Sequence, residues 1–193
     1  INNSAITVTH SVFQDNVGYS IGTYGDSMRW LTDNVFEGNG SDYVQVTAPN
    51  TFFPTSMYDD VTLGPGAGLA GYELKVKVII TDDATLNLLP GTKIVGSSTS
   101  KGLSVEAGNL RALGTRTQPI TFTAKITSPG QWIGLRFAGE RSSGVLDHAV
   151  IQYGGNRDAG VGANLVVQSG AKVTVTGSLI EEGGGTLGGN GIY

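Results

Sequence analysis

Alternating apolar and polar residues, the pattern of a β-strand with one buried face, recur along the whole chain. Near its start, this alternation places the side chains of Ile6 and Val8 on an inward face. No segment combines apolar residues at the 3.6-residue spacing of a helix with capping residues at both ends. The pattern therefore predicts an all-β protein with little or no helix. The clearest strand segments are 5–9, 74–78, 120–123 and 172–176.

A pattern of eight residues occurs twice at an interval of 23 residues, at 9–16 and at 32–39. Looser copies, with a small residue, two apolar residues and then polar turn residues, occupy 147–154 and 176–183. Repetition at a fixed interval is typical of solenoid proteins, in which each repeat stacks on the next. The interval predicts about eight coils, stretched in places by loops.

The repeat favours one of the all-β architectures over the others. In a β-sandwich, successive strands occupy different environments, and nothing requires one strand to resemble a later one. In a parallel β-helix, equivalent residues of successive coils lie above one another, so that similar side chains pack together. We therefore expect a parallel β-helix.

Stacked columns of side chains follow from the repeat. Because adjacent residues of a strand point to opposite faces, one of two neighbouring columns is expected inside the helix. We expect the phenylalanine and isoleucine column to be the inner one. Asn16 and Asn39 are expected to form an asparagine stack at a tight turn, although two unrelated loop asparagines would give the same sequence. The expected stacking core comprises the column Val12, Val35, Val150 and Leu179 and the column Phe13, Phe36, Ile151 and Ile180.

After residue 80 the chain consists of short apolar strands separated by glycine and turn residues, in segments 84–94, 102–115, 118–123, 131–137, 146–155 and 164–182. Together these segments resemble bacterial surface proteins built as right-handed parallel β-helices. The resemblance implies a right-handed parallel β-helix outside the cell. That family includes adhesins, repeat-rich secreted proteins and, more distantly, polysaccharide-degrading enzymes, so the resemblance implies no single activity.

Three regions are expected along the chain. Residues 1–45 are expected to form coils that continue from a preceding repeat unit, and residues 81–193 to form coils that run into the next unit. Residues 46–80 fit the repeat worst. Since proline lacks an amide hydrogen and glycine packs poorly, we interpret their proline and glycine runs as looped-out insertions at a junction.

The two ends of the sequence read as one continuous coil when they are joined. This continuity predicts either a unit of a longer array or a segment trimmed from a larger protein. In the array, tandem copies or subunits stacked head to tail would be the partners of the chain. The expected assembly seam comprises Ile1, Ile6, Val8, Ile192 and Tyr193.

Composition narrows the possible functions. Among the 193 residues, no run approaches the ~18 apolar residues of a membrane span. With a net charge of −4, the chain lacks the excess of positive charge that binding to nucleic acid or to an anionic membrane requires. The 30 glycines and the lack of cysteine indicate many turns and no disulfides. This composition suits a protein that is extracellular or lies on the bacterial cell surface.

Two acidic pairs are the best candidate for a metal site, and stacking could bring their carboxylates within ~5 Å of each other. A calcium ion requires several such oxygen ligands. We favour the alternative in which each aspartate begins a turn and accepts hydrogen bonds from backbone amides, a role that needs no metal or other cofactor. The pairs are Asp59 with Asp60 and Asp82 with Asp83.

No motif of a hydrolase or metalloenzyme site occurs in the sequence. His10 and His148 occupy the same position of the repeat, where Asp33 and Gly177 are their equivalents, and we interpret both as solvated. Polysaccharide lyases and glycoside hydrolases on this fold use carboxylates from neighbouring coils, which leave no motif. Such an enzyme is therefore the catalytic alternative.

Outward Thr-x-Thr pairs raise the further possibility of an ice-binding face. Trp30 interrupts the array because it takes the place of Thr7 in the next coil, and threonine is in any case common in strands. The pairs are Thr7 with Thr9, Thr121 with Thr123, and Thr174 with Thr176.

We interpret the chain as a structural or adhesive segment of a secreted or surface-attached bacterial protein, a stiff rod without catalytic activity. The main alternative is a β-helix that binds or processes carbohydrate, with a surface polysaccharide as its partner. That alternative requires a groove in which aromatic side chains and carboxylates lie together. The aromatic candidates are Trp30, Tyr43, Trp132 and Tyr153, although aromatic residues in a solenoid are more often core residues.

Overall fold

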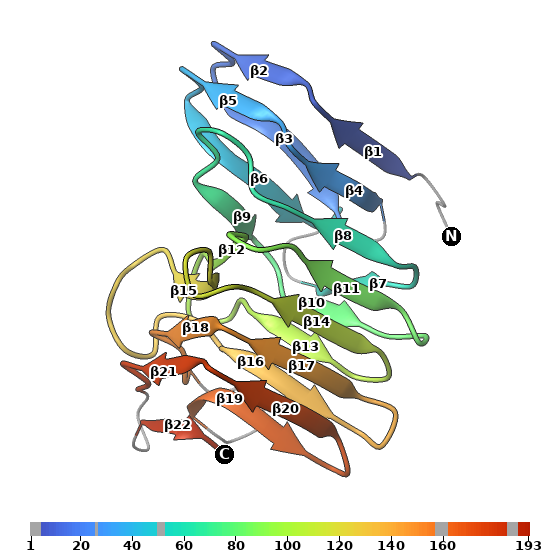
Figure 1. Ribbon diagram of the computed structural model, residues 1–193, viewed down its shortest axis with the longest axis vertical. Helices are drawn as coiled ribbons and strands as arrows, with labels where there is room; N and C mark the ends of the chain where they lie inside the picture. Colours follow the sequence, from blue (N-terminus) through green and yellow to red (C-terminus); the bar gives the residue numbers. More distant parts are fainter. Residues whose placement is uncertain (1–4, 26, 50–52, 157–161, 185–188) are drawn as a thin grey trace.

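The computed structural model describes residues 5–25, 27–49, 53–156, 162–184 and 189–193. These residues form strands and turns, and no helix occurs among them. All strand pairs are parallel, and the chain winds from β1 at one end of the molecule to β22 near the other (Figure 1). The fold is the expected right-handed parallel β-helix.

Three long sheets run along the axis of the helix. The first contains β1 (Ile6–Thr9), β4 (Met28–Thr32), β8 (Val61–Leu63), β11 (Thr85–Leu88), β14 (Asn109–Leu113), β17 (Ser143–Asp147) and β20 (Lys172–Thr176). The second contains β3 (Tyr19–Tyr24), β6 (Ser41–Thr47), β9 (Gly71–Leu74), β12 (Lys93–Gly96), β15 (Ile120–Ala124), β18 (Ala149–Gln152) and β21 (Leu179–Glu181). The third contains β7 (Thr55–Met57), β10 (Val78–Ile80), β13 (Leu103–Val105), β16 (Leu135–Ala138), β19 (Ala163–Gln168) and β22 (Asn190–Ile192). A short fourth sheet pairs β2 (Val12–Gln14) with β5 (Val35–Glu37).

The core consists of columns of apolar side chains, one from each coil, because parallel pairing in register places equivalent residues above one another. On the first sheet, one buried column contains Leu31, Leu63, Leu88, Ala112 and Leu146. On the second sheet, another contains Ile21, Val44, Tyr72, Ile94, Phe122 and Ile151.

The described residues make seven coils rather than about eight, since the first and second sheets have seven strands each. The difference arises because coil length varies. Hydrogen bonds between adjacent coils join residues 23 apart at Ser11 and Asn34, but 34 apart at Asn109 and Ser143. Extra residues in the longer coils lie in loops between the strands, so the sheets stay paired.

The repeated eight-residue pattern marks a sharp corner that follows the first sheet. The equivalent residues His10, Asp33, His148 and Gly177 all have positive φ, between 48° and 57°. One residue in this left-handed conformation turns the chain from one strand into the next. At the residue after the corner, the side chain of Asn34 accepts a hydrogen bond from the amide of Ser11 in the preceding coil (3.0 Å).

The asparagine stack is confirmed. Oδ1 of Asn39 accepts hydrogen bonds from Nδ2 of Asn16 (2.8 Å) and from its backbone amide (3.1 Å). Nδ2 of Asn39 donates to the carbonyl oxygen of Phe13 (3.0 Å). The side chain of Asn39 therefore connects the first two coils at a turn.

The region expected as a junction, residues 46–80, contains β7, β8, β9 and β10, and each of these strands pairs in register with its neighbours. The proline and glycine run at 64–68 lies in the connection between β8 and β9. The paired strands thus run without a break in register over the described residues 53–80.

No helix of the described residues is long and apolar enough to cross a membrane.

Candidate functional site

The outer surface of the second sheet carries a carboxylate that is inaccessible to solvent. Glu73 lies between Tyr72 and Leu74, which both point into the core, so its own side chain points outward. Its side chain is nevertheless 0% exposed. Other side chains must therefore cover the carboxylate of Glu73.

The covering side chains are also the hydrogen-bond donors to this carboxylate. Oε1 of Glu73 accepts from Nζ of Lys75 and from Nζ of Lys125, both at 2.9 Å. Oε2 accepts from the hydroxyl of Tyr19 at 2.7 Å. Tyr19 is 54 residues before Glu73 and Lys125 is 52 residues after it, so strand stacking alone brings them together.

Each lysine also lies over an aromatic ring. Nζ of Lys75 is 5.5 Å from the ring centroid of Tyr19, and Nζ of Lys125 is 5.3 Å from that of Tyr43. These distances are within the range of cation–π attraction. The side chains of Lys75 and Lys125 are 28% and 44% exposed, so both remain accessible from solvent. We call Tyr19, Tyr43, Glu73, Lys75 and Lys125 the Glu73 cluster.

The hydrogen bonds determine the charge of the Glu73 cluster. Burial alone would raise the pKa of Glu73, but the hydrogen bonds from Lys125, Tyr19 and Lys75 outweigh burial and lower that pKa. Burial would also lower the pKa of Lys75, but Tyr19 and Glu73 raise it. At neutral pH Glu73 is therefore a carboxylate and Lys75 an ammonium group.

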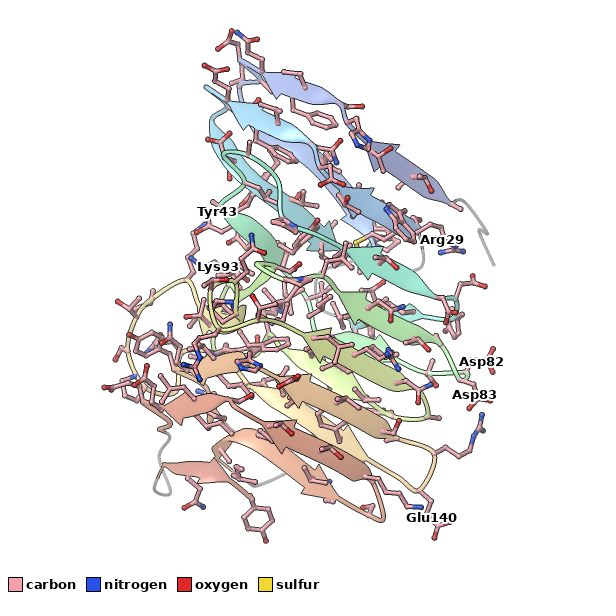
Figure 2. The ribbon with its side chains drawn as sticks, viewed as in Figure 1. Arg29, Tyr43, Asp82, Asp83, Lys93 and Glu140 are labelled. Carbon is pink, nitrogen blue, oxygen red and sulfur yellow. The ribbon has the colours of Figure 1, made fainter. Side chains whose placement is uncertain are left out.

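A third lysine extends the positive charge along the same surface. Gly71 pairs with Tyr43 in the strand on one side of it. In the strand on the other side, the parallel register places the exposed residue Lys93 beside Gly71. Figure 2 shows Tyr43 and Lys93 on the same side of the molecule, opposite the edge that carries Asp82, Asp83 and Glu140. Three lysines thus accompany one glutamate in a chain whose net charge is −4. Such a surface attracts anions.

The carboxylate of Glu73 is buried, and both of its oxygen atoms accept hydrogen bonds within the cluster. The accessible chemistry of the Glu73 cluster is instead that of two ammonium groups and the tyrosine rings beside them. This arrangement suits binding of an anionic ligand with flat apolar faces.

A second ionic group lies on the third sheet. Oε1 of Glu106 accepts hydrogen bonds from Ser104 (2.8 Å) and Arg136 (3.2 Å) and lies 3.4 Å from Nζ of Lys77. Ser104 and Arg136 are paired residues of neighbouring strands.

The four aspartates proposed as calcium ligands do not converge. Asp59 forms an ion pair with Arg29, and Asp83 forms one with Arg141 at 2.8 Å. Oδ1 of Asp60 accepts a hydrogen bond from the amide of Thr85 in the next coil (2.8 Å). Asp82 and Asp83 both have positive φ and lie at the edge of the molecule (Figure 2). In the described part of the chain, no three acidic or histidine side chains form a potential metal site.

The expected stacking core divides into two separate sets. Val12 pairs with Val35 and Phe13 with Phe36 in the fourth sheet, where the two phenylalanine rings stack at 5.3 Å between centroids. The remaining pairs are Val150 with Leu179 and Ile151 with Ile180, in the second sheet.

The two sets do not form one column, because the first two coils contain an additional strand between the first and second sheets. In the last two coils, the segment after the corner is itself the second-sheet strand. Phe36 and Ile151 point into the core, whereas Val12 is 63% exposed and Leu179 is 50% exposed.

The seam residues lie near the two ends of the helix. Ile6 is 40% exposed, and Ile192 and Tyr193 are 55% and 60% exposed. Ile6 therefore does not point into a closed core, whereas Val8 is partly buried against it. Ile1 lies outside the described residues.

The column that contains Thr7 is not a threonine array. Parallel pairing places Trp30, Thr62, Asn87, Arg111, Val145 and Thr174 in succession beside it. Among the aromatic candidates, Trp132 is fully buried, and its Nε1 donates to the carbonyl oxygen of Gln152 (2.9 Å). Trp30 is 47% exposed, and Tyr43 belongs to the Glu73 cluster.

Most of the Glu73 cluster was missed in the sequence, because its members lie far apart in the chain and form no motif. Only one part of the sequence indicates this cluster. Glu73 and Lys75 are two residues apart in a strand whose alternate residues are apolar, and this spacing places both side chains on the outer surface.

The fold and the Glu73 cluster define a single-chain parallel β-helix whose outer sheet surface is the candidate binding surface. A family model described as a pectate-lyase like beta helix domain matches residues 55–166, more than half of the chain. The chain belongs to this pectate-lyase like β-helix family. Comparison with curated proteins and with solved structures gave no significant match.

Proposed function

We propose that this chain is a rigid adhesive module of an extracellular or cell-surface bacterial protein, and that it binds an acidic polysaccharide on the outer surface of the second sheet. The observation that carries the proposal is the Glu73 cluster. One buried carboxylate holds two ammonium groups over two tyrosine rings, and both ammonium groups remain accessible.

The chemistry of the Glu73 cluster supports an acidic glycan over a neutral one. Lys75, Lys125 and the neighbouring Lys93 offer positive charge to carboxylate groups, and the tyrosine rings offer apolar faces to sugar rings. Lys75, Lys93 and Lys125 come from three successive coils, whose strands are ~4.8 Å apart. A polymer with repeated charges fits such a surface better than a single small ion does.

The family description supports the same ligand class. It names pectate lyase, and pectate is an acidic polysaccharide. Fold-level similarity does not by itself transfer an activity, so the proposal depends on the residues of the Glu73 cluster.

Binding is favoured over cleavage at this surface, because Glu73 is buried and fully hydrogen-bonded and is the only carboxylate in the cluster. A lyase or glycoside hydrolase requires a carboxylate or another base that can exchange a proton with the substrate. The enzymatic alternative predicts shortened or unsaturated products after incubation with the polysaccharide. We expect none to form.

The test is titration of polygalacturonate into the protein, with a neutral glucan as control. We expect the combined change of Lys93 and Lys125 to glutamine to weaken binding by roughly tenfold or more, a loss of about 1.4 kcal/mol. Lys172→Gln, which removes one positive charge from an exposed site on the first sheet, is expected to leave binding unchanged. Equal binding by all three proteins would overturn the proposal.

The structural part of the proposal is a stiff spacer built by continuous backbone pairing along the three sheets. Association of copies end to end is a separate proposal, supported by the exposed apolar side chains of Ile6, Ile192 and Tyr193. Electron microscopy would show fibres of uniform width if it holds. Dispersed short particles at high protein concentration would contradict it.

A further inference from the structure

A groove lies at the corner between the first and second sheets, in the last three coils. Its volume is about 280 Å³. The lining includes Thr115, Arg116, Pro119, His148, Gly177 and Leu179. None of these residues belongs to the Glu73 cluster.

Arg116 provides a positive charge that is not used elsewhere. It is exposed, and within the described parts of the chain its guanidinium forms no ion pair or hydrogen bond. Its loop is held in place by internal hydrogen bonds, from the amide of Thr115 to the carbonyl of Gln118 (3.0 Å) and from the amide of Gln118 back to Thr115 (3.2 Å). Gly114 also donates to the carbonyl of Asp147 (2.8 Å), which fixes the loop to the next coil.

The hydroxyl of Thr115 lines the groove beside Arg116. Its oxygen accepts a hydrogen bond from the amide of Gln118 (3.0 Å). The same oxygen lies 3.4 Å from Oγ1 of Thr117, and either hydroxyl can donate in that contact. A ligand in the groove would meet this hydroxyl together with the guanidinium of Arg116.

The ring of His148 is fixed on two sides. Nδ1 lies 2.9 Å from Oδ1 of Asp147, so the carboxylate accepts the hydrogen that Nδ1 carries. The ring also lies over Gly177, where a Cβ atom would be 3.3 Å from Nε2 and Cε1. Nε2 is therefore the nitrogen left for a ligand, and it donates a hydrogen bond when the ring is protonated.

We propose that this groove binds the sulfate or phosphate ester group of a sugar residue. The guanidinium of Arg116 supplies positive charge, and the hydroxyl of Thr115 and the imidazole of His148 line the same groove, which suits a tetrahedral oxyanion. Pro119 and Leu179, whose side chain is 50% exposed, provide an apolar surface for the C–H face of the sugar ring. Of the described groove residues, only Arg116 and His148 have basic side chains, and the acidic group Asp147 contacts His148.

The probes are galactose 6-sulfate and galactose 6-phosphate, with galactose as the neutral control, titrated into the protein and followed by calorimetry. We expect saturable binding of at least one ester and none of galactose. The ester that binds more tightly identifies the natural oxyanion. Failure of both esters to bind would overturn the proposal.

Three variants locate the site. Arg116→Gln and His148→Asn are expected to weaken ester binding by about tenfold or more. Asparagine tolerates the left-handed conformation that residue 148 adopts, so His148→Asn is expected to fold, and circular dichroism checks this. Arg111→Gln is the matched control, because Arg111 is an exposed arginine on the outer surface of the first sheet. An equal loss with Arg111→Gln would show non-specific attraction and overturn the proposal.

The groove and the Glu73 cluster are also distinguishable, since Arg116→Gln is expected to leave polygalacturonate binding unchanged.

Discussion

Nζ of Lys125 lies 2.9 Å from Oε1 of Glu73, although the two residues are 52 positions apart and lie in coils separated by another coil. The same oxygen accepts from Lys75, and the other oxygen accepts from Tyr19. Glu73 therefore connects side chains from three coils on the outside of the sheet.

Replacement of Glu73 by glutamine is expected to destabilise the fold by about 2–4 kcal/mol, because two lysines lose the charge that balances them. The measurement is urea denaturation followed by circular dichroism. Glu140→Gln is the control, since Glu140 is exposed at the opposite edge. A midpoint equal to that of the unchanged protein would mean that Glu73 contributes nothing to stability.

The stabilising effect of Glu73 is expected to depend on pH. Since its pKa is lowered in the folded state, this contribution is present above the ordinary carboxyl pKa of about 4.3 and is lost as pH falls through the lowered pKa. Lys75 acts at the alkaline end of the pH range. Because its pKa is raised in the folded state, its contribution to stability is present below the ordinary lysine pKa of about 10.4 and is lost as pH rises above that value. Denaturation of the protein and of Glu73→Gln should therefore differ by a constant amount near neutral pH and converge in strong acid. A constant difference down to the lowest pH would contradict this assignment.

Asn34→Ala is expected to destabilise the protein by about 2–3 kcal/mol. The buried amide of Asn34 donates to the carbonyl of Val8 (2.9 Å) and accepts from the amide of Ser11, so its removal leaves two backbone groups unpaired. Asn34→Ser is expected to recover part of this loss, because Ser178 fills the equivalent place and accepts from Ala149 (2.9 Å). Chemical denaturation compares the two variants, and equal midpoints would refute the proposed role.

Tyr72→Phe is expected to cost about 1–3 kcal/mol, since the buried hydroxyl lies 2.9 Å from the carbonyl oxygen of Leu31 and 2.7 Å from that of Gly64. Burial raises the pKa of this hydroxyl well above its ordinary value, so it remains protonated as a donor. Thermal unfolding measures the loss. Tyr58→Phe, at a site 49% exposed, should leave the transition unchanged.

The fold could be predicted from the sequence because equivalent positions of successive coils in a β-helix have the same surroundings and therefore favour similar residues. The interval of 23 residues separates two left-handed corners, at His10 and Asp33. Each corner depends on a short local segment, which is why the sequence reveals it. The same interval cannot give the length of the following loop. The segment after Asp33 thus became an additional strand, whereas the segment after His148 became part of the second sheet.

The contacts between coils could not be predicted for the same reason. A constant interval would place Asp60 above Asp83, but the coil there is two residues longer, and Asp60 instead accepts from Thr85, 25 residues later. The difference between the expected and the observed partner grows with each coil of unequal length. It is largest for contacts that cross two coils, such as those of the Glu73 cluster, because they depend on the length of every intervening loop.

The one-residue corner has a consequence for how this protein can change over time. The corner needs only a left-handed backbone, and histidine, aspartate and glycine all provide it, so it imposes little chemical constraint. A loop such as residues 114–119 can replace it while the strands on both sides keep their partners. New recognition elements can therefore be added or exchanged at this edge, one coil at a time, without redesign of the interior.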